Sequence, residues 1–182
     1  GNVSIENSKV IFADEQQRSY AWNIRTGLPV GMPFGYIADG LFQTAEEAAG
    51  SATIAGYTPK AGDIRYRDLN QDGTIDQFDE TAIGSIKPRI YFGFTAGFSF
   101  RGIECSALLQ GVQNRLREVN NFATEAGFLY QNGTYGQAYE QVLDRWTPET
   151  AATATYPRLT ALANENNQQR STFWMRSGNY FR

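Results

Sequence analysis

The stretch IYFGFTAGFSF, residues 90–100, alternates large apolar side chains with small or hydroxyl-bearing ones. A period of two residues is typical of a β-strand, in which successive side chains point to opposite faces. The residues of one face are Phe92, Phe94, Ala96, Phe98 and Phe100, and those of the other are Tyr91, Gly93, Thr95, Gly97 and Ser99. The stretch therefore predicts a strand with one wholly apolar face.

The alternation resumes directly after Arg101 and Gly102. One face of this second run holds Ile103, Cys105, Ala107, Leu109 and Gly111. Two such runs around a two-residue turn that contains glycine predict a β-hairpin over residues 90–112. Its strands of about ten residues are long enough to cross a bilayer at a tilt.

Two kinds of protein account for this hairpin. In an outer-membrane β-barrel the apolar face meets lipid and the other face meets the lumen. Strands of a soluble β-domain also alternate, but they are usually only about five or six residues long. The mean hydropathy of −0.45 fits both kinds. No run of 18 apolar residues is present, which excludes a transmembrane helix but not a membrane strand.

The composition excludes several functions. The formal net charge is −3 and no basic run is present, so nucleic acid is not an expected partner. The chain has no histidine, and Cys105 is its only cysteine. A Ser-His-Asp triad, an intrachain disulfide and an imidazole or thiolate metal site are therefore excluded. The densest group of acidic residues lies in one calcium-like loop instead of forming an acid–base pair, so we do not expect an enzyme.

That acidic loop is DLNQDGTIDQFD, residues 68–79, which matches the twelve-residue calcium loop of EF-hands. The expected ligands, at positions one, three, five, seven, nine and twelve, are Asp68, Asn70, Asp72, the carbonyl of Thr74, Asp76 and Asp79. Gly73 stands where the loop must turn, and Ile75 is expected to anchor it.

We predict a structural calcium ion within the loop of residues 60–85, because AGDIRYR before the ligands has the alternation of a strand and not of a flanking helix. The alternative is a turn whose Asp and Asn side chains cap their own backbone.

Other segments predict shorter elements. RSYAWNIR (18–25) alternates as a strand that SKVIFAD (8–14) could pair with, and STFWMRSGNYFR (171–182) predicts two short strands around a turn. TAEEAA (44–49) has a capping box for a short helix. GQAYEQVLDRWTPE (136–149) has helical spacing, and the polar ENNQQR (165–170) is compatible with disorder.

The membrane-type strands number about five or six, whereas the smallest single-chain bacterial barrels have about eight. An open sheet edge in lipid leaves backbone groups unpaired. A membrane chain with so few strands is therefore expected to be part of a larger barrel.

Several motifs in one order resemble a known family. They are RTGLPVGMPFGYIADGLFQTAEEAA (25–49), AGDIRYRDLNQDGTIDQFDETAIGSIKPRIYFGFTAGFSFRGIECSALLQGV (61–112), DRWTPET (144–150), YPRLT (156–160) and STFWMRSGNYFR (171–182). Together they resemble the C-terminal part of the SusC/RagA family of TonB-linked outer-membrane proteins from Bacteroidetes-type bacteria. Proline appears once in SIKPRI, at Pro88, where relatives often have two.

The resemblance implies a mainly β fold, with residues 1–182 as a partial C-terminal segment of a 22-stranded outer-membrane barrel that has long extracellular loops and short loop helices. It implies import of oligosaccharides or peptides, a SusD-like surface lipoprotein as a lid, and energy from TonB through a missing N-terminal part. No TonB box or plug is visible in these residues. The alternative is a secreted or cell-surface calcium-stabilised β-domain that binds glycan or protein, in which a second sheet would bury the phenylalanine face.

Overall fold

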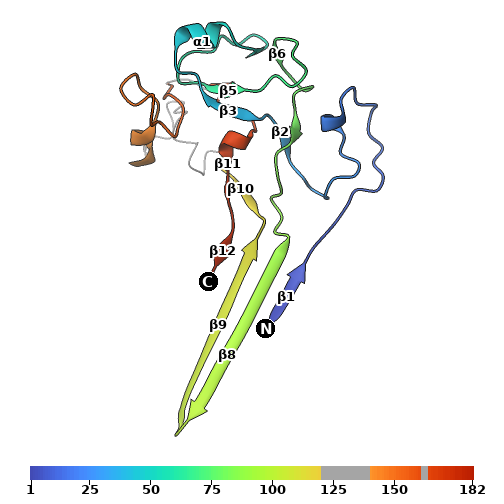
Figure 1. The fold of residues 1–182 in the computed structure, drawn as a ribbon, viewed down its shortest axis with the longest axis vertical. Helices are drawn as coiled ribbons and strands as arrows, with labels where there is room; N and C mark the ends of the chain where they lie inside the picture. Colours follow the sequence, from blue (N-terminus) through green and yellow to red (C-terminus); the bar gives the residue numbers. More distant parts are fainter. Residues whose placement is uncertain (120–139, 161–163) are drawn as a thin grey trace.

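The computed structural model describes residues 1–119, 140–160 and 164–182. A long, narrow sheet, here called the arm, projects from a body of short strands and loops (Figure 1). The elements in chain order are β1 (Asn2–Ile5), η1 (Ala21–Asn23), β2 (Phe34–Gly35), β3 (Ala38–Leu41), α1 (Ala45–Ala49), β4 (Thr53–Ile54), β5 (Ile64–Tyr66), β6 (Thr74–Ile75), β7 (Thr81–Ala82), β8 (Ile90–Phe100), β9 (Ile103–Gln113), β10 (Leu116–Glu118), η3 (Glu140–Asp144), η4 (Thr172–Trp174), β11 (Met175–Ser177) and β12 (Tyr180–Phe181).

The predicted hairpin is present as β8 and β9, which are 11 residues long each. They pair without interruption from Ile90 opposite Gln113 to Phe100 opposite Ile103. Arg101 and Gly102 connect them with φ angles of 49° and 80°. Two positive φ angles are those of a type I′ turn, whose twist matches that of the two strands, and glycine readily takes the second of these positions.

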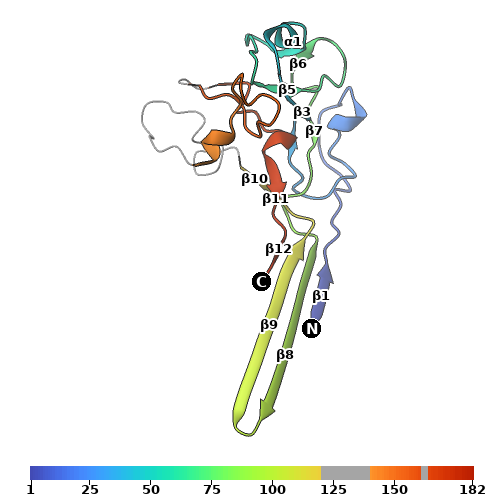
Figure 2. The same ribbon diagram turned by 60° about the vertical axis from the view of Figure 1, so that its left-hand side comes forward.

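Two short strands flank the hairpin, in the order β1-β8-β9-β12. On one edge β1 pairs with residues 90–93 of β8, and on the other edge β12 pairs with Gly111 and Val112 of β9. Both lie beside the half of the hairpin nearest the body, so the outer half consists of two strands alone (Figures 1 and 2).

The body is built from short strand pairs: β2 with β7, β3 with β5, β4 with β6, and β10 with β11. The β4–β6 pair is parallel and the other three are antiparallel. The β10–β11 pair stands between the arm and the body, because β10 follows β9 closely and β11 precedes β12 (Figure 2). Chain segments distant in sequence therefore meet where the arm begins.

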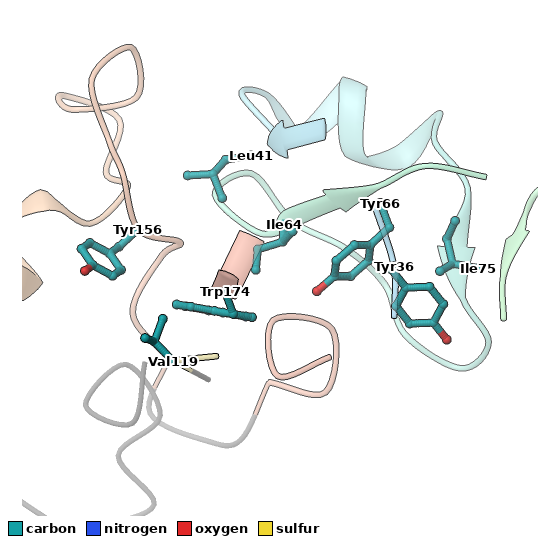
Figure 3. Packing of buried hydrophobic residues seen from close by; sticks show 8 residues of the cluster. All are labelled: Tyr36, Leu41, Ile64, Tyr66, Ile75, Val119, Tyr156 and Trp174. Atoms are coloured by element: carbon teal, nitrogen blue, oxygen red, sulfur yellow. The ribbon is translucent and has the colours of Figure 1, made fainter. Parts of the chain in front are cut away.

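The hydrophobic core lies in the body (Figure 3). Trp174 is fully buried, and the remaining members of the cluster are Tyr36, Leu41, Ile64, Tyr66, Ile75, Val119 and Tyr156. Burying one large apolar side chain contributes about 1.5–3 kcal/mol. The core joins residues near 36–75 to residues near 156–174, so that the two halves of the chain fold as one unit around Trp174.

The short helix predicted over residues 44–49 is confirmed as α1. The Thr44 side chain accepts a hydrogen bond from the Glu47 amide at 3.1 Å, and the Glu47 carboxylate accepts one from the Gln43 amide at 2.7 Å. This is a capping box in which the Glu47 carboxylate binds the amide of the residue before the N-cap, Gln43, instead of the amide of the N-cap residue itself. The two strands predicted within residues 171–182 are also present, as β11 and β12.

Three local predictions are wrong or only partly testable. Residues 18–25 contain the 3₁₀ turn η1 instead of a strand, and residues 8–14 form no strand with them. The helix predicted over residues 136–149 is a 3₁₀ helix at Glu140–Asp144, while residues 136–139 lie outside the described part of the chain. No helix in the described ranges is long and apolar enough to cross a membrane.

Candidate functional site

The register of β8 and β9 places apolar residues opposite one another across the hairpin. Phe94 faces Leu109 and Phe98 faces Cys105. Because directly opposed residues share a face, both strands contribute to one surface, here called the phenylalanine face, whose central residues are Phe92, Phe94, Ala96, Phe98, Phe100, Ile103, Cys105, Ala107, Leu109 and Gly111. Glu104 is the one charged residue of the two strands, and it lies on the opposite face.

The phenylalanine face is exposed. Phe98 exposes 64% of its surface, Phe100 exposes 62% and Ile103 exposes 66%. Near the body, the ring of Phe181 from β12 stacks on Phe92 with 6.1 Å between centroids. The apolar surface is therefore continuous across the strands and uncovered. The surface of an ordinary soluble protein exposes scattered single apolar side chains instead of such a continuous patch.

The predicted calcium loop is closed by Asp79. This carboxylate is fully buried. Its oxygens accept hydrogen bonds from the amides of Leu69 at 2.7 Å and Asp76 at 3.0 Å, and a weaker one from Asn70 at 3.4 Å. The Asp79 side chain, at the last position of the loop, thus binds the backbone both at the start of the loop and near the end of the loop.

The first half of the loop is organised by its own side chains. Asp68 accepts hydrogen bonds from the amides of Gln71 at 2.6 Å and Gly73 at 2.8 Å. Asn70 accepts one from the Asp72 amide, and Asp72 accepts one from the Thr74 amide. These are Asx-type turns, in which a short polar side chain replaces a backbone acceptor.

The second half of the loop is attached to the body. Thr74 and Ile75 form β6 against β4, and Ile75 is 2% exposed in the core. Gly73, with φ at +85°, makes the turn before them. Asp76 accepts a hydrogen bond from the Phe78 amide at 2.8 Å. Ile75 therefore anchors the loop as the sequence predicts.

The donor set suits a hard cation, since carboxylate and carbonyl oxygens are the ligands that calcium prefers. Within residues 1–119, 140–160 and 164–182, however, no group of three or more acidic or cysteine side chains converges as a metal cluster. The carboxylates of the loop bind backbone amides instead. Asp68, Asn70, Asp72, Thr74, Asp76 and Asp79 are thus brought into one compact loop, and a calcium ion there stays a prediction.

Residues 20–23 hold the outer side of the loop. The Trp22 indole donates a hydrogen bond to the carbonyl of Phe78 at 2.8 Å, and the Asn23 amide donates one to the carbonyl of Glu80 at 2.6 Å. Tyr20 stacks on Trp22 with 4.6 Å between ring centroids. These tertiary contacts explain why this alternating segment is a 3₁₀ turn instead of a strand.

A second polar site, which the sequence reasoning missed, surrounds Asp63. This carboxylate is fully buried and is paired with Arg158 at 2.7 Å. It also accepts hydrogen bonds from Tyr57 at 2.7 Å, from Asn164 at 3.0 Å and from Asn167 at 3.1 Å. Burial, followed by the hydrogen bond to Asp63, raises the pKa of Tyr57 to about 12. The site joins β5 to residues 158–167.

Asparagines 166 and 167 correct the expectation of disorder over residues 165–170. Asn167 is fully buried and accepts a hydrogen bond from the Ile64 amide at 2.9 Å, while its carbonyl accepts one from the Trp174 indole at 2.8 Å. The Asn166 amide donates to the carbonyl of Ile64 at 2.9 Å. A polar run is ordered here because its amides satisfy buried backbone groups. The one available signal was the repetition of asparagine at positions 164, 166 and 167.

Comparisons with known proteins show which proteins this chain is similar to. No family model matches the chain. Two curated proteins of Formosa agariphila are similar in sequence: TonB-dependent receptor P26, 34% identical over 97 residues, and TonB-dependent receptor P3, 26% identical over 87 residues. The chain resembles a segment of a TonB-dependent receptor.

The two matches cover 53% and 48% of this chain and 9% of each receptor. The matched part of this receptor-like chain thus spans about a tenth of the length of its curated relatives. Those relatives are receptors and not enzymes, in agreement with the sequence.

Solved structures support the same fold. The RagAB peptide importer in its open-open state superposes with a TM-score of 0.56 at 15% identity, covering 96% of this chain and 17% of the importer chain. A second structure, of the RagAB peptide transporter, gives a TM-score of 0.51 at 17% identity, with 87% and 16% covered. The receptor-like chain is therefore mainly β, with antiparallel strands and few helices, and it shares this fold with a segment of the RagAB importer.

Proposed function

We propose that the chain is part of a TonB-linked nutrient importer of the bacterial outer membrane, in which the β8–β9 hairpin crosses the bilayer. The observation that carries the proposal is the exposed phenylalanine face. Phe98 and Ile103 are more than 60% exposed on a surface without a charged side chain. Exposure of this kind is unfavourable in water and favourable in hydrocarbon.

The length of the hairpin agrees with this role. Eleven residues at about 3.4 Å each make a strand of about 37 Å, which spans about 26 Å when it is tilted by about 45°. The apolar band of outer-membrane barrels is about 25 Å tall. The polar body would then stand on one side of the membrane, with its core and loops in water.

The proposed activity of the whole importer is uptake of oligosaccharides or peptides. Similarity to TonB-dependent receptors supports energy supplied by TonB through another part of the full protein. Similarity in fold to a peptide importer named RagAB supports a two-protein assembly, in which a SusD-like lipoprotein covers the body as a lid. The lipid of the outer membrane would surround the phenylalanine face.

The membrane placement can be tested at adjacent positions of β9 in the full-length receptor. Cys105 shares the phenylalanine face, opposite Phe98, and Ser106 lies on the other face, opposite Gly97. A bimane label on Cys105, in a receptor lacking other cysteines, should be quenched by lipids with nitroxide-labelled acyl chains. The same label on a Cys105→Ser, Ser106→Cys receptor should be quenched several-fold less. Equal and weak quenching at both positions would exclude lipid contact.

The alternative, a secreted or surface β-domain that binds glycan or protein, requires the phenylalanine face to be buried against a second sheet. The exposed fractions of Phe94, Phe98 and Phe100, each above 50%, do not favour it. A full-length protein that fractionates as a soluble species without detergent would support it against the importer.

We also propose that the loop of residues 68–79 takes up calcium as a structural ion, with Asp68, Asn70, Asp72, the Thr74 carbonyl, Asp76 and Asp79 as ligands. Its support is the chemistry of the donor set and the compact loop closed by Asp79. The ion would stiffen a segment whose regular secondary structure is limited to the two-residue strand β6.

Calcium at about a hundred times its dissociation constant should stabilise the loop by about 2.7 kcal/mol. We expect slower amide exchange over residues 68–79 of the full-length receptor in calcium than in a chelator, and no such difference after Asp72→Ala. Gln71→Ala serves as the control, because that side chain is not a predicted ligand. An equal response of Asp72→Ala and the unmodified receptor would remove the metal and leave the Asx turns as the complete description.

A further inference from the structure

A pocket of about 390 Å³ lies where the arm meets the body. The residues that line it are Met32, Gly84, Ser85, Arg89, Asn114, Arg115, Leu116, Ser177 and Asn179. They come from four segments: Met32 ahead of β2, the residues that lead into β8, the connection from β9 into β10, and the turn between β11 and β12. Its lining residues place the pocket at the end of the long strands nearest the body.

The pocket is cationic and has unused hydrogen-bond donors. Arg89 and Arg115 both line it, and none of its lining residues is acidic. The Nε atom of Arg115 is buried without a hydrogen-bond partner. Among the described residues neither arginine side chain forms an ion pair, whereas the arginines at 65, 67, 158 and 170 do. A buried guanidinium nitrogen without an acceptor is unfavourable and indicates that an acceptor is missing.

Arg115 is held in place by its surroundings. Its amide donates to the Asn179 side chain at 3.1 Å, and its carbonyl accepts a hydrogen bond from the Gly178 amide at 2.9 Å. A Cβ atom at Gly178 would lie 3.2 Å from Cγ of Arg115, so the stem of the arginine packs tightly on this turn. The neighbouring Leu116 amide donates to the carbonyl of Ser85 at 2.7 Å. The pocket is thus a built site, and Arg115 is not a solvated surface side chain.

We propose that this pocket binds a phosphate group, with Arg89 and Arg115 as its cationic ligands. The guanidinium fork matches the oxygens of phosphate, and two arginines from different segments can hold one group from two sides. Ser85 and Asn114 supply neutral polar groups beside them. Two cations with no acid in the lining favour a dianionic group over a single carboxylate.

The position of the pocket favours the headgroup of a membrane lipid as the source of that phosphate. Arg89 immediately precedes β8, and Asn114 immediately follows β9. If the phenylalanine face meets hydrocarbon, the ends of these strands lie at the level of the lipid headgroups. This choice of source rests on the proposed membrane function, whereas phosphate binding itself does not.

The test uses the full-length receptor purified in a non-ionic detergent and titrated calorimetrically with two probes, inorganic phosphate and short-chain dihexanoyl phosphatidic acid. We expect the lipid to bind, and Arg89→Gln and Arg115→Gln each to weaken its binding by about tenfold or more. Arg101→Gln is the matched control, because it removes the same charge at the far end of the hairpin, and it should change little.

Each outcome decides the proposal. Binding of both probes, or of the lipid alone, with loss in both pocket variants supports it, and binding of inorganic phosphate alone keeps the phosphate site but excludes the lipid. Absence of binding by both probes, or equal binding by the pocket variants and the control, overturns it. Arg89→Gln leaves the packed Arg115 stem intact and guards against a folding defect. Quenching at Cys105 together with failure of both probes would remove the pocket alone and leave the membrane function standing.

Discussion

The arm and the body of this chain place their apolar residues in opposite ways. In the body, Trp174, Ile64 and Ile75 are buried in one core, and charged side chains that enter it are paired. In the arm, Phe98 and Ile103 point outward and are more than 60% exposed. The body buries its apolar residues as a soluble domain does, whereas the exposed face of the arm fits the apolar surrounding that we propose for it.

The two regions also differ in what holds them together. The arm is held by an uninterrupted antiparallel ladder between β8 and β9, which β1 and β12 extend on its two edges near the body. The body has only two- to four-residue strands, and its segments are joined by side chains such as Asp63 and Asn167 that bind distant backbone or charge. Substitutions inside the body should therefore change stability by altering side-chain packing or by leaving buried polar groups without hydrogen bonds. Substitutions on the arm should change stability according to the medium that surrounds the exposed side chain.

The largest effect is expected at Asp63. Asp63→Ala leaves Arg158 and four other donors without their shared acceptor in the interior, at a cost of about 3–5 kcal/mol. The matched control is Asp39→Ala, which removes an aspartate whose ion pair with Arg67 is partly exposed and should cost only about 0–1 kcal/mol.

Hydrogen exchange of residues 60–67 in the full-length receptor measures both variants, because the Ile64 amide lies next to the Asp63 site. Nearly equal exchange in the two variants would show that the buried network does not stabilise the body and would weaken the contrast with the arm.

A somewhat smaller effect is expected at the middle of the arm. Ala96 lies on the phenylalanine face and Thr95 on the opposite face, and both are exposed. Ala96→Arg should destabilise the membrane-inserted receptor by about 2–4 kcal/mol, because the charge enters the hydrocarbon near the centre of the strand. Thr95→Arg should cost much less.

The measurement is the urea concentration at which half of the full-length receptor, refolded into bilayers, is unfolded. The folded fraction is read from the difference in gel mobility between the folded and the unfolded receptor. Similar midpoints for Ala96→Arg and Thr95→Arg would mean that the two faces of β8 meet the same medium. That result would remove the environmental difference between arm and body.

The β8–β9 hairpin of the arm could be predicted from sequence almost residue by residue, whereas the edge strand β1 and most of the body could not. A two-residue period over 11 residues and a turn of Arg101 and Gly102 specify a hairpin locally. The capping box at Thr44 is local in the same way, and α1 follows from it. Tyr20 and Trp22 alternate like a strand, but their contacts with Phe78 lie more than 50 residues away and decide otherwise.

The candidate sites divide along the same line. The predicted ligand positions of the acidic loop come from its spacing alone, and the structure places Asp68 and Asp79 in one compact loop. Asp63 pairs with Arg158, which lies 95 residues away in the sequence, and no local sequence pattern predicts this ion pair. The same is true of the pocket lined by Arg89 and Arg115, which four separate segments build at the base of the arm.

The smallest effect is expected at α1, the one helix of the described chain that is capped by local chemistry. Thr44→Ala removes the acceptor for the Glu47 amide and should destabilise this turn by about 1 kcal/mol, while Thr44→Ser should change it little. Hydrogen exchange of residues 45–50 is the measurement.

Glu47 also forms an ion pair with Arg65 of β5, so the helix is tied to the body independently of its cap. Because this second link persists in both variants, exchange near Ile64 should stay unchanged. A loss of protection that spread from residues 45–50 to β5 would show that the body unfolds as one cooperative unit, with local caps as important to it as its buried core.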